Sequence, residues 1–115
     1  MSWPYKNKPE MQEMLEKEFF KASKLNNLRL IPAGQAFLYI NKNFPNINLY
    51  TEDLRHPSKE GTYLAALMVF TSLSNKSPIG NTFMMGLDPE VAEILQKVAW
   101  KTYENFQIRV MNSDL

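Results

Sequence analysis

The stretch that decides the predicted fold is residues 53–66, which read DLRHPSKEGTYLAA. It contains the only histidine of the chain, His56, three residues after the carboxylate of Asp53. Pro57 favours an extended conformation at His56, and Ser58 is a good N-cap for a helix that starts directly after it. The stretch therefore predicts a loop that carries an Asp–His pair, followed by the first turns of a helix.

This helix extends to about Ser74 and is apolar on nearly every side, which is typical of a buried helix. The spacing of apolar residues predicts three further helices. One covers residues 9–26, a shorter one covers residues 34–44, and Asp88 and Pro89 open the last one.

Residues 28–31 are expected to form the one strand of the chain, since Leu-Arg-Leu-Ile is short, apolar and followed by Pro32. A helix followed by so short a strand is typical of the end of a repeating α/β pattern. An isolated strand is not stable, so its partner strands are expected to come from elsewhere. The predicted fold class is therefore α/β.

Composition excludes several kinds of function. With 115 residues the chain is long enough for one domain, and its formal net charge of +1 gives no electrostatic reason to bind nucleic acid or an anionic membrane. The absence of cysteine excludes disulfides and thiolate sites, and with a single histidine no metal or cofactor is expected. There is no visible signal peptide, and no apolar run reaches the roughly 18 residues of a membrane span. A soluble chain of undetermined compartment is expected.

The pair of Asp53 and His56 is the main candidate for chemistry. The carboxylate can bond one ring nitrogen across a turn and leave the other free as a general base. A lone histidine is more often a structural or surface residue, and both interpretations remain open. Arg55, inside the same stretch, either binds an anionic part of a substrate or is simply exposed.

Residues 53–66, together with Ser77-Pro78-Ile79-Gly80, closely resemble the last conserved block of the bacterial SGNH (GDSL-like) hydrolases. The resemblance covers most of the chain. It implies that residues 1–115 are a single partial domain, the C-terminal part of a three-layer α/β/α, flavodoxin-like fold, mostly helical with about one strand. It also implies a serine esterase for acyl or acetyl esters, including those on carbohydrates, with His56 as general base and Asp53 as its orienting partner.

The nucleophile of such an enzyme is not evident in the chain. The Gly-Asp-Ser-type block and the glycine and asparagine blocks of the family are missing and are expected to precede Met1, so the chain is expected to be inactive alone. Ser58 is better used as an N-cap than as a nucleophile. If the chain is such a fragment, its helices and strand were built to cover an absent sheet, and the apolar patches left exposed are expected to drive association. The alternative is a non-catalytic, mostly helical module that self-associates or packs on a partner chain.

Overall fold

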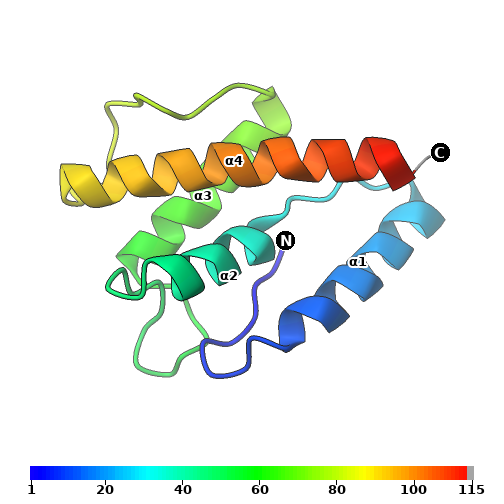
Figure 1. The fold of residues 1–115 in the computed structure, drawn as a ribbon, viewed down its shortest axis with the longest axis horizontal. Coiled ribbons are helices and arrows are strands. Elements are labelled where there is room, and N and C mark those ends of the chain that lie inside the picture. The colour runs from blue at the N-terminus through cyan, green and yellow to red at the C-terminus, as the bar shows by residue number, and fades with distance from the viewer. Residues whose placement is uncertain (114–115) are drawn as a thin grey trace.

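The computed structural model describes residues 1–113 of the predicted 1–115 domain, in which α2, α3 and α4 form a central group and α1 lies to one side (Figure 1). In chain order the helices of this part are α1 (Met11–Asn26), α2 (Ala33–Asn43), α3 (Lys59–Ser74) and α4 (Pro89–Ser113). Helices α2, α3 and α4 pack on one another, whereas α1 lies against α2 and contacts α4 through the Phe20–Phe106 ring pair and the Glu16–Arg109 ion pair. None of the described helices combines the length and apolar character that a bilayer crossing requires.

The predicted α/β fold class is wrong. Residues 1–113 contain no strand, only one isolated antiparallel bridge between Tyr50 and Pro57. The three-layer α/β/α architecture implied by the resemblance to SGNH hydrolases, with its single strand in this segment, is therefore absent from the described residues. The alpha/beta description of this chain is therefore wrong, and residues 1–113 form an all-helical domain.

The predicted strand at residues 28–31 instead links α1 to α2. Asn27 caps α1 in a left-handed conformation, and the N–H of Leu28 donates to the Ser23 carbonyl at 3.0 Å. The Arg29 guanidinium donates to the carbonyl of Ser72 on α3 at 3.4 Å, so this segment bonds to helices rather than to another strand. A strand needs a second extended segment beside it, and none lies there within residues 1–113.

The helices themselves are confirmed close to their predicted bounds. Helix α3 begins directly after Ser58, whose Oγ accepts a hydrogen bond from the N–H of Gly61 at 3.1 Å. At the start of α4, the side chain of Asp88 accepts from the N–H of Glu90 at 2.9 Å. Local spacing and capping therefore determined these elements correctly.

Helix α3 is buried on one side and open on the other, which corrects the prediction that it is buried all round. Leu64 and Met68 are fully buried, and they face α2 and α4 in the core. Phe70 and Leu73 are 42% and 60% exposed, and together with Ala66 they form an open apolar stripe along α3. The apolar residues around α3 therefore did not predict which of its faces are covered by other helices.

A buried amide ties the loop after α3 to the core. The Gln96 side chain of α4 is fully buried, and its Nε2 donates to the Tyr63 hydroxyl at 2.9 Å and to the Asn81 carbonyl at 3.0 Å. Its Oε1 accepts from the N–H of Gly80 at 3.1 Å. Every polar atom of this amide has a hydrogen-bond partner, so its burial does not carry the free-energy cost of an unpaired buried polar group.

The start of α3 lies against the backbone of the preceding loop. A Cβ added at Gly61 would be 2.1 Å from the carbonyl oxygen of Leu49, which is far inside van der Waals contact. Glycine at this position therefore lets the helix approach the loop that carries Asp53 and His56.

We expect the substitution Gly61→Ala to destabilise the protein by about 1–3 kcal/mol, as overpacking in a rigid contact does. On an open helix the same change would stabilise by roughly 1 kcal/mol, so the sign of the effect reports the contact with Leu49. Urea unfolding followed by circular dichroism measures it, with Thr62→Ala at the neighbouring exposed position as the control. A Gly61→Ala protein as stable as the wild type would contradict this close approach.

Candidate active site

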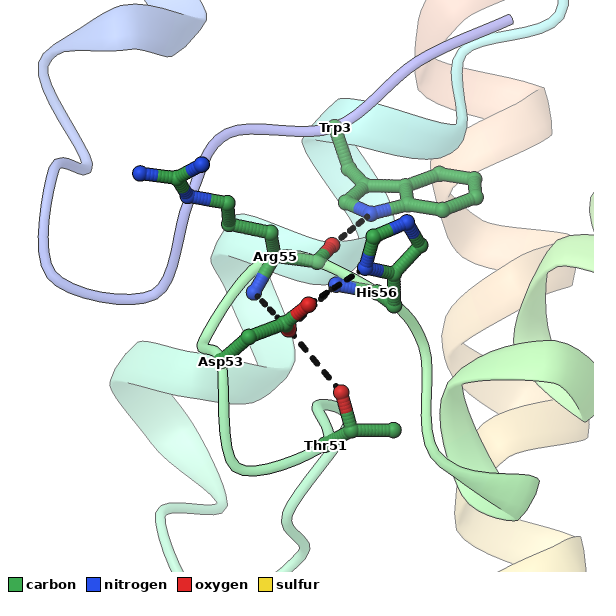
Figure 2. A network of polar contacts seen from close by, with 5 residues as sticks. All are labelled: Trp3, Thr51, Asp53, Arg55 and His56. Atoms are coloured by element: carbon green, nitrogen blue, oxygen red, sulfur yellow. Dashed lines mark hydrogen bonds and ion pairs between the residues drawn. The ribbon is translucent and has the colours of Figure 1, made fainter.

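The loop between α2 and α3 folds back on itself before α3 begins. The N–H of Thr51 donates to the His56 carbonyl, and the N–H of Ser58 donates to the Leu49 carbonyl, both at 2.8 Å. Between these two bonds the chain reverses through Leu54, which adopts a left-handed conformation with φ of 62°. This reversal brings the side chains of residues 53 and 56 to the same side of the loop (Figure 2).

The carboxylate of Asp53 is held at both of its oxygens. Its Oδ1 accepts hydrogen bonds from the Thr51 hydroxyl and from the backbone N–H groups of Arg55 and His56, each at 2.9 Å. Its Oδ2 contacts Nδ1 of the His56 ring (Figure 2). An aspartate that bonds the backbone two and three residues on is a common turn-forming arrangement. The carboxylate is thus fixed by the turn and orients the imidazole.

The hydrogen bonds of this carboxylate also determine its charge. The side-chain hydrogen bond with His56, followed by the backbone N–H groups of His56 and Arg55, holds the pKa of Asp53 well below its usual range. Each of these groups favours the ionised form. Asp53 is therefore a carboxylate throughout the neutral pH range.

The imidazole of His56 is open to solvent. Its side chain is 78% exposed, compared with 46% for Asp53, and its Nε2 has no hydrogen-bond partner among residues 1–113. In the neutral imidazole, a carboxylate at Nδ1 favours the ring proton on that nitrogen, which leaves the lone pair on Nε2. This is the arrangement of an orienting carboxylate and a general base.

The N-terminal segment clamps the loop from one side. The indole N–H of Trp3 donates to the Arg55 carbonyl at 3.1 Å, and the N–H of Lys6 donates to the Leu54 carbonyl at 2.9 Å. The Trp3 ring stacks on Phe37 of α2, with ring centroids 4.7 Å apart. A tryptophan so close to the start of the chain is the sequence signal for this clamp, and its role in holding the site was not predicted.

Arg55 lies beside the pair but does not point towards it. Its guanidinium is 4.8 Å from the centroid of the Tyr5 ring, and Figure 2 shows its side chain directed away from Asp53 and His56. The structure thus brings two of the three predicted site residues together. The role of Arg55 in binding a substrate stays a prediction.

None of the serine hydroxyls that the structure describes hydrogen-bonds to His56. The hydroxyl of Ser58 donates to the Asn48 carbonyl at 2.7 Å and accepts from Gly61, so it is engaged as the N-cap that the sequence predicted.

Within residues 1–113 no three histidine, aspartate or glutamate side chains lie close enough together to hold a metal ion. Thr51, which supports the carboxylate, was missed in the sequence, although a threonine two residues before an aspartate is a turn-forming pattern.

No protein-family model, curated protein or solved structure matches this chain. The likeness to SGNH hydrolases therefore depends on the residues of the block alone. The roles of His56 as a base and Asp53 as its partner remain predictions that the geometry accommodates.

The lowered pKa of Asp53 leads to a prediction about stability and pH. The pKa of Asp53 is lower in the folded protein than its unfolded value of about 3.9. The ionised carboxylate therefore stabilises the folded protein fully at pH values above the unfolded pKa, and this stabilisation is lost as the pH falls below it. We expect the wild type to exceed Asp53→Asn in stability at pH 5, by an amount that shrinks towards pH 2. Urea unfolding at a series of pH values measures this difference.

The control is Glu52→Gln, which removes a neighbouring carboxylate that makes no hydrogen bond or ion pair within the described residues. The loss of stability in Glu52→Gln at pH 5 is expected to be smaller than the loss in Asp53→Asn. Added salt should reduce the Asp53 effect, because both partners of the pair are exposed. A difference between wild type and Asp53→Asn that stays constant from pH 5 to pH 2 would contradict the assignment.

Proposed function

We propose that Asp53 and His56 act as the orienting carboxylate and the general base of a serine hydrolase that cleaves ester bonds. The observation that carries this proposal is the contact of Asp53 Oδ2 with Nδ1 of His56, in a carboxylate whose other oxygen accepts three hydrogen bonds. The imidazole is oriented without being covered, so its Nε2 is accessible to a reacting hydroxyl.

The chemistry follows from this geometry. His56 Nε2 would take the proton from a serine hydroxyl as its oxygen attacks the carbonyl carbon of the ester. The imidazolium, stabilised by the Asp53 carboxylate, would return that proton to the leaving alcohol as the acyl-serine forms. Water, deprotonated by the same imidazole, would then release the carboxylic acid and restore the serine.

We propose that the nucleophilic serine comes from outside residues 1–113. The hydroxyl of Ser58 is engaged as the N-cap of α3, which supports this. The 78% exposure of the His56 side chain also supports it, because it leaves room for a second chain segment. The resemblance of residues 53–66 to the SGNH hydrolases favours acyl or acetyl esters, including those on carbohydrates, as substrates. The proposal concerns the chemistry of this pair and does not include the three-layer fold.

We expect that the chain alone does not hydrolyse p-nitrophenyl acetate through an acyl-serine. It should also fail to react with a serine-directed phosphonate. Mixed with the serine-bearing N-terminal portion of an SGNH hydrolase, it should hydrolyse the ester. His56→Gln should lower that rate by roughly a hundredfold or more, the usual contribution of a general base. Asp53→Asn should lower it as well, because the imidazole loses its orientation.

Asp88→Asn is the matched control, since it removes the same charge at the start of α4, where the carboxylate bonds the N–H of Glu90 and neither Asp53 nor His56. It should leave the rate unchanged. Phosphonate labelling of the chain alone would show a nucleophile within it and would refute an external serine. Ester hydrolysis in the mixture that is equal for His56→Gln and the wild type would refute the role of the pair.

A second candidate function, self-association without catalysis, is favoured by one observation. Phe70 and Leu73 expose apolar surface on α3, and Met14 and Leu25 are 70% and 75% exposed on α1. An exposed apolar stripe such as the one along α3 marks an interaction site. This function would leave the Asp53–His56 pair as a turn-stabilising contact only.

For this candidate we expect concentration-dependent association of the wild type in sedimentation velocity, since burying the α3 stripe removes apolar surface from water. The double substitution Phe70→Lys and Leu73→Lys should give a monomer. Thr62→Lys, at an exposed position in the first turns of the same helix, is the control and should associate like the wild type. A wild type that sediments as a monomer at every concentration would exclude self-association through this face.

A further inference from the structure

A cavity of about 410 Å³ lies at the opposite end of α3 from the Asp53–His56 loop. It forms where the C-terminal ends of α1, α3 and α4, which Figure 1 shows on one side of the molecule, meet the link between α1 and α2. With a rise of about 1.5 Å per residue, the 16 residues of α3 separate the two places by roughly 20 Å. The cavity therefore belongs to no part of the proposed ester-hydrolysing site.

The lining of this cavity is positively charged. Lys24 and Arg29 line it, and no aspartate or glutamate does. Neither cation forms an ion pair within residues 1–113, where Arg29 makes only the 3.4 Å hydrogen bond to the carbonyl of Ser72. Lys24 in the last turn of α1 also complements the negative end of that helix, but Arg29 lies beyond the helix and has no such role.

The cavity also has unused hydrogen-bonding capacity. Ser72 lines it and is only 4% exposed, yet its hydroxyl has no hydrogen-bond partner among the described residues. Nearly all buried polar groups in folded proteins are paired, so this hydroxyl is an exception that calls for a partner. The side chain of Asn75 accepts from the Tyr103 hydroxyl through Oδ1, and its amide N–H groups have no partner in the described part of the chain.

Aromatic side chains complete the walls of the cavity. Phe20 of α1 and Phe106 of α4 pack together there, with ring centroids 5.8 Å apart, and Leu28 and Leu30 add aliphatic surface. A volume of about 410 Å³ falls within the range of small-molecule sites, which combine apolar walls with a few polar groups.

We infer that this cavity binds a small anionic molecule, with its negative group held by Arg29 and Lys24 and its apolar part against Phe20 and Phe106. Two unpaired cations beside unpaired hydroxyl and amide donors match the oxygens of a phosphomonoester or a carboxylate. The site is independent of the proposed hydrolase function, and it holds even if the Asp53–His56 pair has no catalytic role.

Isothermal titration calorimetry with phenyl phosphate, benzoate and phenol tests the inference. At least one of the two anions should bind saturably, and tighter binding of phenyl phosphate or of benzoate assigns the head group as phosphate or carboxylate. Inorganic phosphate should bind more weakly than phenyl phosphate, because it makes no contact with the aromatic walls. Failure of both aromatic anions to bind, or binding of phenol as tightly as either, would overturn the inference.

Substitutions localise the site. Arg29→Gln and Lys24→Gln should each weaken binding of the better anion roughly tenfold, as loss of one charge-assisted hydrogen bond does. Lys21→Gln, on the same helix but outside the lining, is the matched control and should bind like the wild type. An equal loss of affinity in Lys21→Gln and Lys24→Gln would indicate general attraction to the surface and would overturn the inference.

Ser72→Ala separates a ligand contact from a structural role. Removing a hydroxyl that has no partner in the folded chain should not lower the midpoint of thermal unfolding. It should nevertheless weaken binding of the anion severalfold. Because Lys24 is exposed, Lys24→Gln gives a folded protein for the binding measurement even if Arg29→Gln does not fold. Unchanged affinity in both Arg29→Gln and Lys24→Gln would refute the site.

Discussion

The close approach of α3 to the backbone at Leu49 is the constraint on which the candidate site depends. The Leu49 carbonyl accepts from the N–H of Ser58, and there is no room for a side chain at Gly61 beside it. Ser58 in turn caps α3 and bonds the Asn48 carbonyl, so the helix start and the loop form one unit. The reversal at residues 50–57 is closed by these bonds, and within it Asp53 contacts Nδ1 of His56 and orients the imidazole.

Two layers of contacts hold the pair in place. Within the loop, the carboxylate of Asp53 accepts three hydrogen bonds that any chain with this local sequence can form. From outside the loop, the N-terminal segment holds it through two hydrogen bonds. The indole N–H of Trp3 donates to the Arg55 carbonyl, and the Pro4 carbonyl accepts from the Tyr50 hydroxyl at 2.7 Å. The result is a carboxylate held by hydrogen bonds beside an open imidazole, which suits transfer of a proton from an incoming hydroxyl to Nε2.

The two ends of α3 differ in chemistry. At its N-terminal end the helix supports an anionic carboxylate beside an exposed ring, and at its C-terminal end it contributes Ser72 to a cavity lined by two cations. Between them, one face of the helix is buried against α2 and α4 and the other exposes Phe70 and Leu73. One apolar helix therefore organises the core, the candidate catalytic loop and the proposed anion site.

The sequence by itself determined the helices and the local geometry of the pair, because caps, proline and the i, i+3 spacing of Asp53 and His56 act over a few residues. Tertiary structure alone decided the rest. Residues 28–31 have strand-like composition, but a strand requires a neighbour, and these residues bond to helices instead. Three other features depend on residues that are far apart in the chain. They are the clamp by Trp3, the open face of α3, and the cavity that Ser72 shares with Lys24 and Arg29. No local pattern encodes which of these residues come together.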